Sequence, residues 1–335
     1  MKDFVGEADL LKGVGTFRGY STYTFQDGAS LTLSYVAEAK PTGLHGDYTV
    51  ISGSGAYANA TGKGVFDSVP TKWTDGASLF DVAIDVHTPP LMGGGYTDVI
   101  SIPVNDPAIK AISGALIKPS GAGPFPAVVY VSGCAGINSP LERAQHKAVI
   151  DHLLSKGVAT FIIDPFTPRN EPEGVCANLD EKRATQYFTR GGNDVLAALN
   201  VLEAMPDIDT KHIFLQGYSY GAISSLFATD RKNPANHAKV AGMIAYYPYC
   251  YDGVDPSVPV LVMIGEKDDW TPAAKCQAVT GKTDFDVVVY PGDTHAFTMA
   301  FEKPVDYLGH HFVYDEKSTQ DAQQRADAFM AAHMK

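Results

Sequence analysis

The residues of this sequence that could carry out chemistry begin with a serine between two glycines, in Gly217-Tyr218-Ser219-Tyr220-Gly221. An apolar segment over 213–216 precedes this Gly-x-Ser-x-Gly motif, and a segment over 222–227 that can form a helix follows it. A sharp turn from a strand into a helix exposes the serine hydroxyl, and the glycines let the two elements pass close together. The motif therefore predicts a nucleophile, and the alternative is an ordinary turn with an exposed serine.

A serine hydroxyl becomes a strong nucleophile only when a base removes its proton, and an acid usually orients that base. Two later segments can supply these groups. One apolar segment leads into the adjacent acids Asp268 and Asp269, and another leads into a loop that holds His295. Because both loops follow predicted strands, we expect them at the same edge of a sheet as Ser219.

The elements that must position these residues alternate between strand and helix. Short apolar runs, typical of strands buried on both faces, occupy 126–132, 158–163, 213–216, 241–246, 260–264 and 287–290. Helical patterns occupy 141–156, 181–205 and 318–334. This alternation predicts an α/β domain with a mostly parallel sheet that is covered by helices on both faces.

The first part of the chain has a different pattern. Residues 20–25 and 30–35 alternate with a period of two, Gln26-Asp27-Gly28 between them predicts a turn, and 47–51 predicts a third strand. The prolines and glycines of 86–98 are typical of a linker. We therefore expect a small all-β domain, barrel-like or a plain sheet, over 1–85, a linker over 86–98 and the catalytic domain over 99–335.

Composition narrows the class of protein. Of 335 residues, 45% are hydrophobic and 19% are charged, as in globular domains. The net charge of −12 disfavours nucleic-acid binding, because phosphate requires clustered basic side chains. The sequence contains no run of about 18 apolar residues, the length that a transmembrane helix requires, so we expect no transmembrane segment. The four cysteines lack zinc-ligand spacing, which argues against a structural zinc site. A serine nucleophile with its base needs neither a metal nor a cofactor, so we expect none.

Five segments in order over the C-terminal part of the chain resemble the dienelactone hydrolase family of α/β-hydrolases. They are Ser132-Gly133-Cys134-Ala135-Gly136, Asp164-Pro165-Phe166-Thr167-Pro168-Arg169, Gly217-Tyr218-Ser219-Tyr220-Gly221, Gly265-Glu266-Lys267-Asp268-Asp269-Trp270-Thr271-Pro272 and Tyr290-Pro291-Gly292-Asp293-Thr294-His295-Ala296-Phe297. The resemblance implies the α/β-hydrolase fold. In the N-terminal part, residues 46–62 resemble the glycine-punctuated hairpin of allene-oxide-cyclase-like and dirigent-like β-barrels.

The resemblance also implies roles for single residues. The family's acid usually lies four residues before a proline, which favours Asp268 over Asp269. The backbone N–H groups of Cys134 and Tyr220 would form an oxyanion hole. This chain has Ser219 where the namesake enzymes carry cysteine, and Ser132 where the family often has histidine. Both differences favour a general ester over dienelactone as the substrate.

Large side chains in or beside these loops are expected to form the substrate pocket, although some could simply belong to the core. They are Trp270, Phe297, Tyr218, Tyr220 and Phe166. Arg169 could meet an acidic group of the substrate or form a local salt bridge.

The cysteines suggest two disulfides. Cys250 and Cys276 lie near the ends of adjacent predicted strands, whose spacing of about 5 Å would allow a bond. Cys134 and Cys176 lie in loops at the same edge of the sheet, and the resemblance supports this pair because similar pairs recur in exported members of the family. Two disulfides would indicate a secreted or periplasmic protein whose signal peptide is not in this sequence. The alternative is a cytoplasmic protein with four buried thiols.

The sequence thus favours a serine ester hydrolase, a carboxylesterase that forms an acyl-enzyme and acts on a small-molecule or polymeric ester. Two alternatives remain. The same fold could carry a peptidase, lyase, peroxidase or lactone hydrolase activity. The N-terminal β domain could instead bind a polymer or glycan, with the hydrolase as an accessory.

Overall fold

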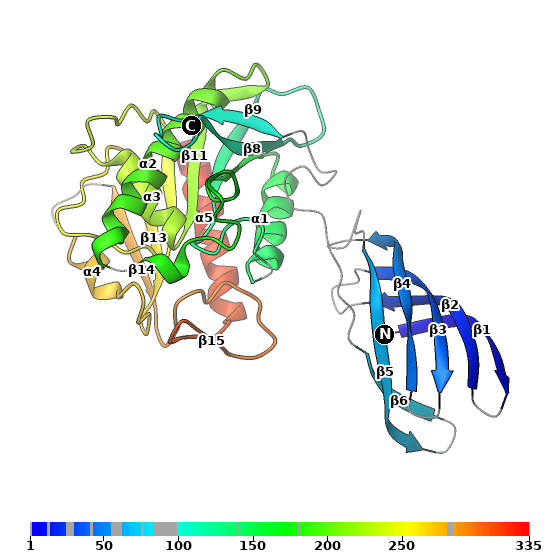
Figure 1. The fold of residues 1–335 in the computed structure, drawn as a ribbon. Helices are drawn as coiled ribbons and strands as arrows, with labels where there is room; N and C mark the ends of the chain where they lie inside the picture. The colour runs from blue at the N-terminus through cyan, green and yellow to red at the C-terminus, as the bar shows by residue number, and fades with distance from the viewer. Residues whose placement is uncertain are drawn as a thin grey trace. The chain divides into compact units, whose positions relative to one another are not determined.

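A computed structural model gives the arrangement of the chain (Figure 1). It describes residues 2–11, 14–24, 30–40, 43–54, 62–74, 77–82, 99–139, 141–179, 181–279 and 284–334. The chain forms two compact units, residues 1–95 and 96–335. The predicted turn at 26–28, and all of the predicted linker 86–98, lie outside the described residues.

The N-terminal unit contains a six-stranded antiparallel sheet whose strands lie in chain order. The strands are β1 (Lys2–Leu11), β2 (Val14–Thr24), β3 (Ser30–Lys40), β4 (Gly43–Ser54), β5 (Lys63–Thr74) and β6 (Ala77–Val82). Side chains on one face form an apolar cluster of Leu31, Leu33, Ala37, Tyr48, Val50 and Phe66. The alternation of side chains along each strand produces this face, and the predicted β character of this segment is confirmed.

The C-terminal unit is built on an eight-stranded sheet in the order β14-β13-β12-β11-β9-β10-β8-β7. The strands are β7 (Ile100–Pro103), β8 (Ala111–Ile117), β9 (Phe125–Val131), β10 (Ala159–Asp164), β11 (Ile208–Tyr218), β12 (Gly242–Tyr246), β13 (Val260–Gly265) and β14 (Phe285–Tyr290). The six strands from β9 to β14 are parallel, whereas β7 and β8 pair antiparallel at one edge. Every residue of β10, β12 and β13 is buried, which explains their continuous apolar sequences.

Helices cover both faces of this sheet (Figure 1). They are α1 (Arg143–Ser155), α2 (Glu181–Glu203), α3 (Tyr220–Thr229), α4 (Ala273–Gln277) and α5 (Glu316–His333). α2 packs against α3 on one face. On the other face Asp327 of α5 forms ion pairs with His152 of α1 and with Lys156, the residue that caps α1. The predicted α/β fold with a doubly covered, mostly parallel sheet is therefore confirmed.

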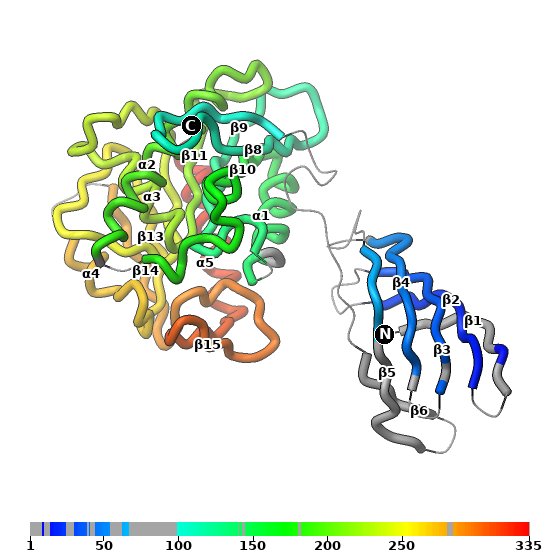
Figure 2. The backbone as a smooth tube through the Cα atoms, viewed as in Figure 1, coloured from blue at the N-terminus to red at the C-terminus, as the bar shows by residue number. Residues whose placement is uncertain are grey.

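The order of the strands places the site. From β9 the chain passes to β10 on one side, and it later returns to β11 on the other side of β9, a path that can be followed by colour in Figure 2. The loops that follow β9 and β11 therefore leave the same sheet edge in different directions. In open α/β sheets such a switch point forms the ligand crevice.

Candidate active site

Ser219 lies in the turn between β11 and α3, with a backbone φ of 47° and ψ of −114°. The glycines on either side of Ser219 make this sharp turn possible, because backbone segments come into contact at both positions. A Cβ atom on Gly221 would lie 2.2 Å from the carbonyl oxygen of Val131, at the end of β9. A Cβ atom on Gly217 would lie 2.5 Å from the backbone nitrogen of Ala222. The glycines of the motif are thus required for the close approach that holds Ser219 at the sheet edge.

Three side chains from three different loops meet at this edge. The Nε2 atom of His295 lies 3.1 Å from Oγ of Ser219, and its Nδ1 atom lies 2.8 Å from Oδ2 of Asp268. His295 follows β14 and Asp268 follows β13, as the sequence predicts. Asp268 and His295 are only 4% and 3% exposed. A continuous chain of hydrogen-bonding groups therefore runs from a buried carboxylate to the serine hydroxyl.

The Asp268 carboxylate is fixed by its own loop. Its Oδ1 atom accepts hydrogen bonds from the backbone N–H groups of Trp270 at 3.0 Å and Thr271 at 2.7 Å. The adjacent Asp269 has a half-exposed side chain and pairs with His310 at 3.1 Å. The geometry thus favours Asp268 over Asp269 as the partner of His295.

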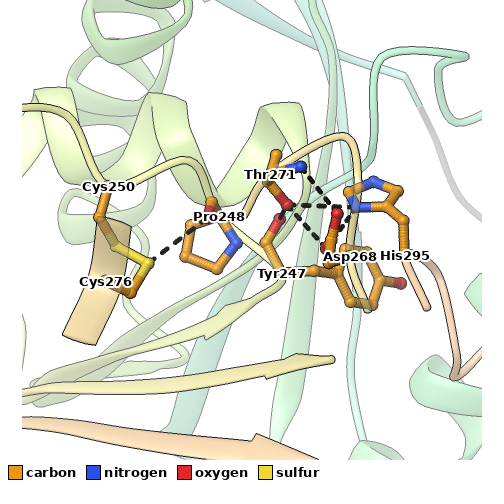
Figure 3. The surroundings of a disulfide bond; sticks show 7 residues. All are labelled: Tyr247, Pro248, Cys250, Asp268, Thr271, Cys276 and His295. Atoms are coloured by element: carbon orange, nitrogen blue, oxygen red, sulfur yellow. Dashed lines mark hydrogen bonds and ion pairs between the residues drawn. A yellow bond between two sulfur atoms is a disulfide. The ribbon is translucent and has the colours of Figure 1, made fainter. Parts of the chain in front are cut away.

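Thr271 is a residue of this site that the sequence did not reveal. Its hydroxyl lies 2.8 Å from Oδ2 of Asp268, 3.0 Å from the carbonyl oxygen of Tyr247 and 3.2 Å from Nδ1 of His295 (Figure 3). The hydroxyl has a single proton, so it can donate to only one of the two oxygens at a time. The one feature of the sequence that could have indicated this role is its position, a hydroxyl residue three positions after Asp268. Thr271 connects the loop of Asp268 to the segment that follows β12.

Both predicted disulfides are present, between Cys134 and Cys176 and between Cys250 and Cys276. Each joins two segments near the site. The first links the loop after β9 to the 3-10 turn at Cys176–Asn178. The second links the segment after β12 to α4, which begins directly after the loop of Asp268 (Figure 3). The sulfur of Cys276 also contacts the carbonyl oxygen of Pro248 at 3.5 Å. The disulfides therefore restrain two of the loops that form the site.

A pocket surrounds the Ser219 and His295 side chains. Its walls include the backbone of the loop after β9, with Gly133, Cys134 and Ala135, and the side chains of Leu141, Glu142, Gln145, Tyr218, Tyr247, Trp270, Met299, Tyr307 and Phe312. Trp270 and Tyr218 thus line the pocket, as expected. The walls are mostly apolar and aromatic, with Glu142 and His295 as the titratable exceptions other than tyrosine.

Phe166 and Phe297 were expected in the pocket wall, but the structure places both in the core. Phe166 is 1% exposed and packs on Tyr220, in a cluster that also holds the Cys134–Cys176 disulfide. Phe297 is fully buried against Tyr247 and Tyr290. The Tyr220 side chain is also buried, so this residue can contribute only its backbone to the pocket. A position beside a site loop did not determine which way these side chains point.

An unpredicted hairpin supplies part of the wall instead. It consists of β15 (Val305–Tyr307) and β16 (His310–Phe312), and both Tyr307 and Phe312 line the pocket. Trp270 stacks on His310 with ring centroids 4.4 Å apart and on Phe312 at 5.9 Å. Three-residue strands are too short to show periodicity, so little in the sequence pointed to this hairpin.

The C-terminal part of the chain matches a known protein family. A protein-family model for the dienelactone hydrolase family matches residues 112–334, more than half of the chain. This protein belongs to the dienelactone hydrolase family. The resemblance seen in the five segments of its sequence is therefore confirmed for the C-terminal unit, and with it the α/β-hydrolase fold. No curated protein matches the chain.

Solved structures support the same fold for this family member. A protein of Klebsiella pneumoniae described as a dienelactone hydrolase is 20% identical, with a TM-score of 0.54, over 70% of this chain and 98% of its own. A dienelactone hydrolase-like promiscuous phosphotriesterase from metagenomic libraries is 18% identical, with a TM-score of 0.54, over 71% and 99%. An esterase of Thermogutta terrifontis with propionate bound is 15% identical, with a TM-score of 0.51, over 71% and 94%. At such identities the likeness shows the fold alone.

The oxyanion hole that the family resemblance implies has suitable groups in this dienelactone hydrolase family member. Tyr220 is the first residue of α3, where the helix leaves backbone N–H groups without internal partners. The N–H of Ser219 is already used, because it donates to the carbonyl oxygen of Tyr246 at 2.9 Å. Among the described residues, no backbone or side-chain acceptor engages the N–H of Cys134. The N–H groups of Tyr220 and Cys134 are thus both available to a ligand.

Arg169 does not reach the pocket. Its side chain is 4% exposed, and its guanidinium donates two hydrogen bonds of 2.9 Å to the Asp194 carboxylate and a third of 2.9 Å to Asp106. These partners raise the pKa of Arg169 against the opposing effect of its burial. Of the two predicted roles, the local salt bridge is the one that the structure supports.

The described ranges hold neither a metal-ligand cluster nor a membrane-spanning helix. No three His, Cys, Asp or Glu side chains there are grouped so that they could hold a metal ion. No helix in the described part of the chain is long and apolar enough to cross a membrane.

Proposed function

We propose that this protein is a serine ester hydrolase of the carboxylesterase type, acting through Ser219, His295 and Asp268. The observation that carries the proposal is the unbroken chain of hydrogen bonds from Asp268 through His295 to the Ser219 hydroxyl, 2.8 and 3.1 Å long. It lies at the switch point of the sheet and opens into an apolar pocket. Fold membership alone would suggest a hydrolase, but this geometry supplies a nucleophile, a base and an orienting acid.

The reaction follows from the groups that face one another. His295 accepts the Ser219 proton at Nε2 while Oγ attacks the ester carbonyl carbon, and the carbonyl oxygen gains the negative charge. The backbone N–H groups of Cys134 and Tyr220 would donate to that oxygen, each worth roughly 3 kcal/mol of barrier. His295 then protonates the departing alcohol, which leaves an acyl group on Ser219. A water molecule, deprotonated by His295, releases the acid and restores the serine.

Asp268 does not need to take the proton in this scheme. It accepts a hydrogen bond from Nδ1–H of His295, which keeps Nε2 free to act as the base, and it stabilises the imidazolium that forms. The two backbone donors to its other oxygen hold the carboxylate in place during the reaction.

A profile across p-nitrophenyl esters of increasing acyl length, measured for wild type and Ser219→Ala, tests the proposal. We expect hydrolysis by wild type and a fall in kcat of at least about 10⁴-fold in the variant, because no other group can replace the attacking oxygen. Hydrolysis of peptides or lactones without hydrolysis of simple esters would instead favour another reaction on the same fold. Activity that survives in Ser219→Ala would rule out the acyl-enzyme.

We also propose that the protein acts outside the cytosol, secreted or periplasmic. Its two disulfides support this assignment, because such bonds persist mainly in oxidising compartments. Fractionation of the source cells with an antibody to the protein tests it. Recovery with the cytosolic fraction alone would contradict the assignment.

A further inference from the structure

A buried acid lies beside the loop of the proposed oxyanion hole and has no part in the mechanism above. Glu142 lies directly before α1, lines the pocket and is 7% exposed. Its Oε2 atom accepts a hydrogen bond of 3.0 Å from the backbone N–H of Gly133, the residue directly before Cys134. The carboxylate thus binds the loop at the residue that directly precedes Cys134.

The carboxylate packs directly against Gly133, in the space that a side chain at that position would enter. A Cβ atom there would lie 2.7 Å from Oε1 of Glu142. The rest of the loop is tied down at other points. Cys134 is bonded to Cys176, and its carbonyl oxygen accepts a hydrogen bond of 2.7 Å from the N–H of Val175. Glu142 therefore supplies the restraint on the side of the loop that faces α1.

We propose that Glu142 is a positioning residue that holds the loop after β9 in the shape required for an oxyanion hole. By binding the N–H of Gly133, it fixes the start of the loop and leaves the N–H of the next residue, Cys134, for the substrate oxygen. The inference rests on the proposed function, in which Cys134 stabilises the oxyanion. Glu142 itself exchanges no proton with the substrate.

The charge of Glu142 connects this restraint to pH. Burial raises the pKa of its carboxyl to about 7, although the hydrogen bond from the N–H of Gly133 opposes the shift. The titratable groups that face it are His146, whose Nε2 lies 3.5 Å from Oε2, and the hydroxyls of Tyr130, Tyr247 and Tyr307. A protonated carboxyl has less capacity to accept hydrogen bonds. The loop should therefore be held best above about pH 7, where the carboxylate is ionised.

Two variants test the role in different ways. Glu142→Gln keeps the shape but removes the charge, so the N–H of Gly133 faces either a weaker neutral acceptor or an NH₂ group. Gly133→Ala keeps the acid but displaces its carboxylate. Loss of an oxyanion donor costs about 10²–10³ in kcat, so we expect each variant to lose about 10–100-fold in kcat with KM changed less than about 3-fold.

The pH profile separates positioning from a general loss of structure. Wild type should lose kcat below pH 7 more steeply than Glu142→Gln, because only wild type has this carboxyl to protonate. The matched control is Glu171→Gln, which removes a partly buried acid from an ion pair with Arg190 and does not line the pocket. We expect the control to keep the wild-type kcat and pH profile.

Hydrogen exchange gives a readout that does not depend on activity. The amides of residues 132–136 should exchange at least about tenfold faster in Glu142→Gln than in wild type, with the disulfide intact. Unchanged exchange, or a kcat within 2-fold of wild type in a folded variant, would overturn the inference. If Glu142→Gln does not fold, Gly133→Ala decides by the same criteria. Faster exchange in a protein that hydrolyses no ester would refute the proposed function and leave the anchoring role standing.

Discussion

Replacing Asp268 by asparagine tests the orientation of His295. The amide oxygen of the new side chain can keep the two backbone hydrogen bonds from Trp270 and Thr271, so the loop should hold its shape. The amide NH₂ group would then take the place of Oδ2, 2.8 Å from Nδ1 of His295. A donor at that position requires Nδ1 to accept, which moves the ring proton to Nε2.

This tautomer removes the base from the serine. With a proton on Nε2, 3.1 Å from Oγ, His295 cannot accept the hydroxyl proton of Ser219. The same change in a serine protease triad lowers kcat by about 10⁴, equivalent to roughly 5 kcal/mol of barrier, and we expect a loss of that order here. KM should change little, because Asp268 does not line the pocket.

The assay is kcat and KM for a p-nitrophenyl ester at a pH of about 8, with thermal unfolding as a check of the fold. Asp269→Asn is the matched control, since Asp269 is half exposed and pairs with His310 instead of His295. The control should stay within about 3-fold of wild type. A loss below about 10-fold for Asp268→Asn, or an equal loss for both variants, would refute the assignment of Asp268.

Three further predictions concern redox state, pH and substrate charge. Intact-mass spectrometry of the unreduced, denatured protein after alkylation should show no modified thiol, and four alkylated thiols would contradict both disulfides. The disulfides close loops with sequence separations of 42 and 26, so reduction should lower the free energy of unfolding by roughly 3–4 kcal/mol for each of them. The raised pKa of Glu142 lets the folded state keep a proton that the unfolded state loses above about pH 4.5, so this group should lower the free energy of unfolding by about 3 kcal/mol as the pH rises from about 4.5 to about 7. Urea unfolding of wild type and Glu142→Gln at pH 5 and pH 8 measures this loss. Equal changes with pH in both proteins would contradict the prediction. At pH 8, esters with a carboxylate on the acyl chain should be hydrolysed at least about tenfold more slowly than neutral esters of equal length. The reason is that the described residues of the pocket wall include the acid Glu142 and no Lys or Arg. Equal kcat/KM values for the two kinds of ester would refute this prediction.

Much of the fold could be predicted because its physical causes are local. Strands such as β10 and β13 are buried on both faces, and their unbroken apolar runs between turn residues made them visible in the sequence. The loops with Ser219, Asp268 and His295 could be placed together because parallel strands present their carboxyl ends at one edge. Strand spacing predicted the Cys250–Cys276 bond and the family resemblance supported Cys134–Cys176, and both disulfides are present.

The remaining parts depend on contacts that the sequence does not display. The hairpin of β15 and β16 is too short for a periodic pattern, and it nevertheless forms a wall of the pocket. Glu142 would be expected on the surface like most charged residues, and its burial depends on the space beside Gly133. Phe166 and Phe297 lie beside site loops but point into the core, which only tertiary packing decides. The role of the N-terminal sheet, including any contact with a polymer or glycan, stays a prediction.

Covalent labelling can identify the nucleophile, which we assign to Ser219. Wild-type protein is treated with an organophosphate that carries a good leaving group, and peptide mass spectrometry then locates the adduct while residual esterase activity is followed. We expect one phosphoryl group per chain, located on Ser219, with activity lost in proportion to labelling and no adduct in Ser219→Ala. An adduct on another residue that accompanies the loss of activity, or full activity in a protein labelled on Ser219, would contradict this assignment.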